Sequence, residues 1–324
     1  MRKGTWIALL LALVAAAAVS LVVGPVSISL SDVCGALFGN GDTQVVAIIQ
    51  TIRLPRMALG IVVGAGLSVS GVALQATLRN PLAEPYLLGV SGGAAVGAVM
   101  GSALGWVQPG AIALGAFGGA ALAVVLVLAV AHAAGAGSSS PVLVMAGVVV
   151  GAFANAAILV ILAGAPAAAI RDALWWMMGS LSGATWSAVA WLSVFVLAGG
   201  SALWIRAREI DVLSLGGDAA AALGVDVDRA TRSVFLLSAV LAAATVSAAG
   251  LVGFVGLLVP AIVRALGART SRSTFVSAAV TGAALVVAAD MIARTVRSPA
   301  ELPLGAVTAL VGVPFFLARM RSRA

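Results

Sequence analysis

The residues that could perform chemistry are few in this chain, and they gather in one segment. Of its 29 charged side chains, nine lie in a stretch of 27 residues: Arg206, Arg208, Glu209, Asp211, Asp218, Asp226, Asp228, Arg229 and Arg232. A single histidine, His132, and a single cysteine, Cys34, exclude a His/Cys metal cluster and a disulfide framework. The charged segment is too short to fold alone, yet longer than a tight turn requires. We interpret it as a surface that contacts another protein.

The remaining polar positions do not assemble a reaction centre. Asp290 lies in an apolar stretch, and one interpretation of such a residue is that it couples transport to protons. Arg294 follows one helical turn later, so an ion pair or a helix cap is the simpler interpretation. Ser138, Ser139 and Ser140 form a polar turn without a nearby base in the sequence, and therefore do not predict a nucleophile. We predict no enzyme, and the energy for any transport must come from outside the chain.

The elements that position these residues are predicted to lie in lipid. Hydrophobic residues make up 62% of the chain and charged residues only 9%, whereas a soluble domain carries about 25% charged residues. The 38 glycines favour close helix packing in a bilayer. The alternating apolar and polar segments of a membrane β-barrel are absent from the sequence. The fold class predicted is an all-α polytopic membrane protein, with one domain over residues 1–324.

Apolar runs separated by Gly, Pro, Ser or charge predict ten transmembrane helices. They lie near residues 5–24, 57–78, 87–105, 110–133, 142–164, 187–205, 233–251, 253–267, 275–293 and 304–318. The run from Val234 to Val263 has no charge, so the break at Gly250–Gly253 is an interpretation. The basic start and the apolar run from Trp6 to Val23 also resemble a signal peptide. We favour a retained first helix, because about twenty residues span a bilayer.

The basic residues predict the orientation of these helices. With ten spans, 13 of them fall on the side of the N-terminus and 5 on the other side; the five are Arg53, Arg56, Arg171, Arg294 and Arg297. Because positive loops stay inside, this division predicts cytoplasmic termini and a cytoplasmic charged segment.

Several motifs, in order along essentially the whole chain, resemble one family. They are GLSVSGVALQ at residues 66–75, RNPLAEP at 79–85, LGVSGG at 88–93, GFVGLLVP at 253–260 and PAELPLG at 299–305. The chain is identified as a member of the FecCD or cobalamin-permease-like family, the permease subunits of type II ABC importers for ferric siderophores, haem and cobalamin. The chain departs from the family pattern at Ala261, where many relatives carry histidine, so no role of that histidine transfers. The Gly216-Gly217 pair before Asp218 also differs from the usual acidic pattern.

The resemblance implies a permease of the bacterial cytoplasmic (inner) membrane that imports a metal chelate by alternating access. A ferric siderophore is expected before haem or cobalamin. Helices two to five and seven to ten are expected to form an inverted repeat. The expected partners are a second copy of the chain, two ABC ATPase subunits and an extracytoplasmic binding protein, and nucleic acid is not among them. The chain lacks a P-loop, so we expect no cofactor on it and ATP-Mg on the ATPase subunits. The alternative is a self-contained secondary transporter or channel.

The resemblance also assigns the cytoplasmic region 207–232 to coupling with the ATPase. Asp218-Ala219-Ala220, with Gly224 four residues later, resembles the EAA-type coupling sequence, with Asp in place of Glu. An Ala-rich helix that ends near Gly224 would present a smooth, rigid knob. The predicted contact residues are Leu215, Asp218, Ala219, Ala220, Leu223, Gly224 and Val225. A merely solvated loop is the alternative.

Three further sites are implied. Arg53 and Arg56 at the outer end of helix two, with Arg294 at the outer end of helix nine, match positions that dock glutamates of the binding protein. Anchoring to the membrane surface is the alternative for these arginines. The turn Ser138–Ser140 matches the cytoplasmic gate. Helices five and ten would border the pathway, where Asn155 is either a pathway residue or a helix–helix hydrogen-bonding residue.

Overall fold

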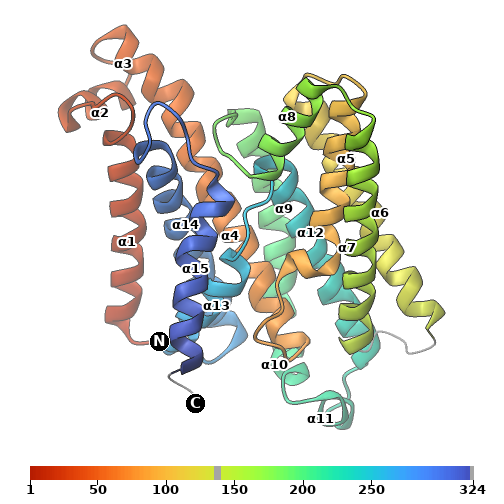
Figure 1. Cartoon of the computed structure of the whole chain (residues 1–324). Coiled ribbons are helices and arrows are strands. Elements are labelled where there is room, and N and C mark those ends of the chain that lie inside the picture. Colours follow the sequence, from red (N-terminus) through yellow and green to blue (C-terminus); the bar gives the residue numbers. More distant parts are fainter. Residues whose placement is uncertain (135–139, 322–324) are drawn as a thin grey trace.

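The computed structural model describes residues 1–134 and 140–321, which fold into a bundle of helices without strands in those ranges (Figure 1). Ten helices match the ten predicted spans: α1 (Lys3–Val22), α4 (Leu54–Thr77), α5 (Val90–Ala103), α6 (Pro109–Ala133), α7 (Ser140–Ala163), α9 (Trp186–Ile205), α12 (Val227–Ala249), α13 (Val255–Ala265), α14 (Ser271–Thr295) and α15 (Leu304–Arg321). Of these, α5, α13 and α15 are shorter, and the described residues include seven helices long and apolar enough to cross a membrane. The all-α prediction is confirmed.

Short helices and helical turns link the long helices, most of them at the two ends of the bundle. They are α2 (Leu30–Leu37), α3 (Thr43–Ala47), the π-helical turn η1 (Ile48–Arg53), the 3₁₀ turn η2 (Pro85–Leu88), α8 (Ala167–Met177), α10 (Ala207–Leu213) and α11 (Gly217–Ala222). Figure 1 shows α2, α3 and α8 at one end, and both termini with α10 and α11 at the other. The predicted topology likewise has the termini and the charged segment on one side. We call the two ends outer and inner, after that predicted topology.

Helix α4 passes through the middle of the molecule. With α3 and η1 it forms one continuous helix over Thr43–Thr77, most of it buried, and it therefore starts earlier than the predicted span. The π-helical turn directly precedes Pro55, which lacks the N–H that a regular α-helical turn would use there. This turn brings Arg53 and Arg56 to the outer end of α4 as buried residues.

Two glycines let α4 touch its neighbours backbone to backbone. A Cβ atom on Gly64 would lie 2.1 Å from the carbonyl oxygen of Gly282 in α14. A Cβ atom on Gly71 would lie 2.0 Å from the carbonyl oxygen of Gly256 in α13. Lipid gives helices no hydrophobic drive to associate, so this close van der Waals packing is what holds them together.

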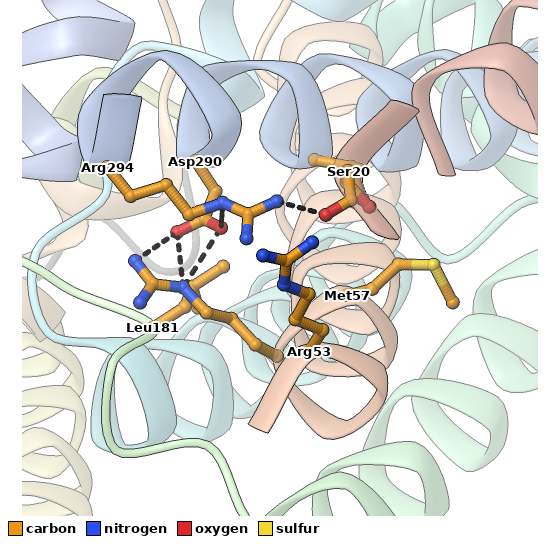
Figure 2. A pocket seen from close by; sticks show the side chains of 8 residues that line it. Ser20, Arg53, Met57, Leu181, Asp290 and Arg294 are labelled. Atoms are coloured by element: carbon orange, nitrogen blue, oxygen red, sulfur yellow. Dashed lines mark hydrogen bonds and ion pairs between the residues drawn. The ribbon is translucent and has the colours of Figure 1, made fainter. Parts of the chain in front are cut away.

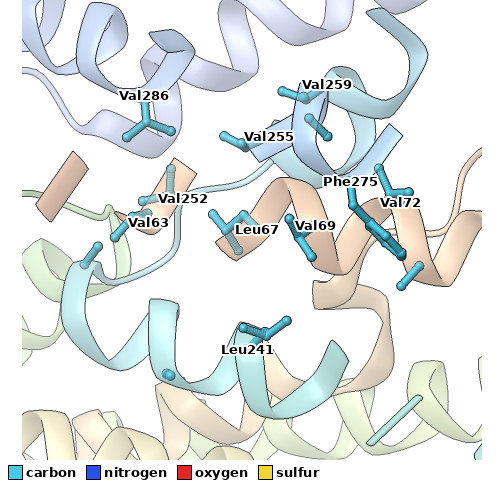
Figure 3. Close-up of a cluster of buried hydrophobic side chains, with 14 of the residues drawn as sticks. Val63, Leu67, Val69, Val72, Leu241, Val252, Val255, Val259, Phe275 and Val286 are labelled. Carbon is cyan, nitrogen blue, oxygen red and sulfur yellow. The ribbon is translucent and has the colours of Figure 1, made fainter. Parts of the chain in front are cut away.

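Two large buried clusters form the interior. The first joins α4 to α9, α12, α13 and α14, and Figure 3 shows Leu67, Leu241, Val255 and Val286 within it. The second joins α5, α6 and α7 to another face of α12, through residues such as Phe235. Helix α12 belongs to both clusters, so it connects the two halves of the bundle.

The predicted break after α12 is confirmed. Helix α12 ends at Ala249, Gly250 follows with φ +68°, and α13 begins at Val255. Phe254 precedes α13 with φ +67°, a left-handed conformation that is uncommon for a bulky residue. The break is thus set by backbone geometry, since no charged side chain marks it and the polar Thr245 and Ser247 bond to carbonyl oxygens within α12.

Candidate functional site

A buried ion cluster lies at the outer end of the bundle. Arg56 of α4 donates from Nε and Nη2 to the carboxylate of Asp290 in α14, at 2.9–3.0 Å. The same guanidinium donates to both carboxylate oxygens of Glu301, at 2.7 and 2.9 Å. Charge-assisted bonds of this kind are about twice as strong as neutral ones. The cluster therefore joins α4 to α14 and to the segment that leads into α15.

Two more arginines of the cluster cap the outer end of α1. Arg294, one turn after Asp290, lies 3.7 Å from it, and its Nη2 donates to the carbonyl oxygen of Ser20 (Figure 2). Arg53 donates to the carbonyl oxygens of Leu21 and Val22. The last carbonyls of a helix have no partner within it, and they attract positive charge. The arginines satisfy these carbonyls and so fasten α1 to α4 and α14.

The structure shows that the predicted docking arginines are buried. It brings Arg53, Arg56 and Arg294 together at the outer end, but they are only 4%, 7% and 5% exposed. The gap between them has no room for a water molecule. A sequence specifies how far along a helix a residue lies, but not which way its long side chain turns. The predicted pair of Asp290 with Arg294 is confirmed, although Arg56 is the nearer partner of Asp290.

The inner end carries the charged segment as two short helices, α10 and α11. The predicted Ala-rich helix is present: α11 follows Gly216 at φ +121° and ends before Gly224 at φ +81°. Asp218, Ala219 and Gly224 are exposed, and Leu215 and Leu223 are 66% and 64% exposed. These five residues make an open surface that combines one carboxylate with two large apolar side chains.

Two predicted contact residues of this segment pack inward instead. Ala220 is fully buried against Leu213 and Ala230. Val225 is partly buried and packs on the same small cluster. Ala220 lies on the side of α11 that faces this cluster, and Val225 follows the end of α11, so both residues pack beneath the exposed surface and are not part of it.

The other charges of the segment fix its shape. Asp226 caps the start of α12 by accepting the N–H of Arg229 at 3.1 Å. Arg206 pairs with Glu209 at 3.0 Å, within one turn. Asp211 accepts from the N–H and hydroxyl of Ser271 at 2.8 and 2.6 Å, which ties α10 to the start of α14.

The motif at residues 79–85 and the residue after it have a structural role that the sequence does not predict. The Glu84 carboxylate accepts the N–H of Phe254 at 2.7 Å, and the Tyr86 hydroxyl accepts the N–H of Val252 at 3.0 Å. Burial raises the pKa of the Glu84 carboxyl, while the bond from Phe254 lowers it. The loop before α5 thus holds the break between α12 and α13. The sequence signal that could have revealed this role is Glu84 itself, the one acidic residue between Asp42 and Asp172.

The predicted gate and pathway residues fall, in the sequence, within α7 or directly before it. Ser138 and Ser139 fall outside the described residues, and Ser140 begins α7. Asn155 is exposed, and among the described residues it makes no helix–helix hydrogen bond. It shares its helix with an exposed apolar surface that includes Val148, Phe153 and Leu159. Asn155 therefore faces outward from the single chain, and its place on a pathway stays a prediction.

These features define a polytopic helical membrane protein with a tightly bonded outer end and an open inner surface. A family model, the FecCD transport family, matches residues 10–322, and the chain belongs to that family. A solved structure described as an inward-facing conformation of a metal-chelate type ABC transporter is similar, with a TM-score of 0.86 and 28% identity. The alignment covers 97% of each chain.

Curated relatives are similar over most of their length. The cobalamin import permease BtuC of Halobacterium salinarum is 43% identical, over 88% of this chain and 76% of the relative. The Fe(3+)-citrate import permease YfmD of Bacillus subtilis is 35% identical, over 92% and 88%. The hemin transport permease HmuU of Yersinia pestis is 36% identical, over 82% and 80%.

Proposed function

We propose that this chain is the permease subunit of an ATP-driven importer that moves a metal chelate into the cytoplasm by alternating access. The family match over residues 10–322 carries this proposal. The named relatives handle cobalamin, ferric citrate and hemin, all of them metal ions held in an organic ligand. We expect a ferric siderophore as cargo. Cobalamin is the second candidate, because the 43% identical relative is a cobalamin permease.

Reconstitution tests this function. The chain is placed in liposomes with its ATPase and binding protein, and uptake of ferric siderophore, haem and cobalamin is measured with and without ATP. We expect ATP-dependent uptake of one class. Uptake by the chain alone, without the ATPase, would instead support a self-contained secondary transporter or channel.

The inner surface is the proposed contact for two ABC ATPase subunits, which hold ATP and Mg²⁺ while this chain holds no cofactor. Leu215 and Leu223 supply apolar contact, and Asp218 sets the register. The small side chain of Ala219 keeps the exposed side of α11 smooth, so that this side can fit into a groove of the ATPase subunit. The positive-inside count supports a cytoplasmic position for this surface in the bacterial inner membrane.

A second copy of the chain is the proposed partner of the exposed side of α7. The pathway would run between the copies, bordered by α7 with Asn155 and by the exposed residues Leu310 and Val313 of α15. The gate proposed at Ser138–Ser140 would lie at the inner end of this pathway. Cysteine crosslinking of Asn155→Cys between copies tests the arrangement. A Leu122→Cys control on α6 should not crosslink, and equal crosslinking of both would refute this dimer.

The extracytoplasmic binding protein is proposed to dock at the outer end. Arg53, Arg56 and Arg294 outnumber the carboxylates of Asp290 and Glu301 by one, which favours a carboxylate from the partner. Because the arginines are buried, that carboxylate must enter between α1, α4 and α14. Arg53→Gln removes a guanidinium that contacts only backbone carbonyls among the described residues. Weaker binding of the partner is expected, whereas exposed Arg171→Gln serves as the control.

A further inference from the structure

A groove on the side of the bundle lies apart from both ends. It runs between α4, α9 and α14 and has a volume of about 300 Å³. Its lining is almost wholly apolar and includes Val69, Val196, Leu197, Gly200 and Val276. A Cβ atom on Gly200 would meet nothing within 4 Å, so the groove is open at this residue. Neither the ATPase surface nor the pathway uses these three faces.

A cation stands at one end of the groove. Trp204 lines that end, and the guanidinium carbon of Arg272 lies 4.7 Å from the centre of its ring. Arg272 is exposed and has no ion pair with a carboxylate in the described part of the chain. The neighbouring Asp211 is already engaged by Ser271, and Arg206 by Glu209. The positive charge of Arg272 is therefore available to a ligand.

The dimensions fit one leaflet of a bilayer. From Trp204 to Val196, eight residues of helix span about 12 Å. Half of a hydrocarbon core is about 15 Å. Tryptophan and arginine at one end are typical of the boundary between lipid and water, and apolar walls are typical of the acyl region.

From the groove and its cation we infer a binding site for an anionic phospholipid of the cytoplasmic leaflet. One acyl chain lies in the groove beside Gly200, and the phosphate accepts hydrogen bonds from Arg272. The leaflet follows from the orientation proposed above, whereas the site itself depends only on the contacts described. A single arginine near a membrane surface contributes ~1 kcal/mol toward an anionic lipid, which corresponds to about a fivefold preference.

Native mass spectrometry of the purified full chain tests the site. The chain is exchanged into detergent with equal amounts of phosphatidylglycerol and phosphatidylcholine, and the retained lipid is counted. We expect about fivefold more phosphatidylglycerol than phosphatidylcholine on the unaltered chain. Arg272→Ala should remove that preference, and Gly200→Leu should lower retention of both lipids by filling the groove.

Matched variants separate the site from general effects. Arg269→Ala removes another exposed inner arginine that does not line the groove, and should keep the preference. Gly118→Leu adds the same side chain at an open position of α6, and should keep the retention. Equal retention of the two lipids by the unaltered chain would overturn the proposal. So would unchanged retention in Gly200→Leu, because the acyl chain would then lie elsewhere.

Discussion

The outer and inner ends of this molecule use charge in opposite ways. At the outer end, Arg56, Asp290 and Arg294 are buried, and their bonds join helices more than 200 residues apart in the sequence. At the inner end, the pairs Arg206–Glu209 and Arg229–Asp226 lie within one helical turn and are exposed. Long-range buried pairs fix how helices sit together, whereas local exposed pairs only shape a segment. The outer charges therefore hold the fold, and the inner charges leave a surface free for a partner.

The strongest test of this contrast is Asp290→Asn. The variant keeps the shape of the side chain but leaves Arg56 and Arg294 without their shared carboxylate. Removing one partner of a buried ion pair costs ~3–5 kcal/mol. We expect a large drop in the midpoint of thermal unfolding in detergent. Asp172→Asn, at an exposed outer position, is the control and should unfold near the temperature of the unaltered chain.

The next test alters the inner surface. Asp218→Lys combined with Ala219→Trp reverses the charge and adds bulk at two exposed positions of α11. We expect at least a tenfold loss of ATP-dependent uptake in liposomes, with little change in thermal unfolding. Unchanged uptake would remove α11 from the ATPase contact. A drop in unfolding temperature as large as that of Asp290→Asn would contradict the division between the two ends.

The smallest effect is expected for Glu209→Gln. Its ion pair with Arg206 is 40–45% exposed, and exposed pairs of this kind contribute about 0–1 kcal/mol. Thermal unfolding should change by no more than a small fraction of the Asp290→Asn effect. The residual difference should shrink further in high salt, since solvent ions screen exposed charges. A loss comparable to that of Asp290→Asn would show that the inner pairs also hold the fold.

Sequence reasoning located the helices well because lipid imposes a simple rule on apolar runs. The two glycines of Gly250–Gly253 were enough to predict the break between α12 and α13. Sequence reasoning did not reveal the burial of Arg53, because the direction of a long side chain depends on helices that are distant in the sequence. It also placed the buried Ala220 among the contact residues, since a helix as short as α11 shows no periodicity long enough to reveal its buried side. The role of Glu84 also lay beyond it, because a backbone N–H such as that of Phe254 leaves no mark in the residue types.

The glycine contacts of α4 have a mechanical consequence. Where Gly64 meets Gly282 and Gly71 meets Gly256, backbone touches backbone, and no side chain is present that could rotate to permit sliding. Helices α4, α13 and α14 must therefore turn as one rigid body during any change of shape. Any hinge must therefore lie between such rigid bodies. We expect it at α12, which packs in both clusters, and at Gly250 and Phe254, which follow α12 with positive φ.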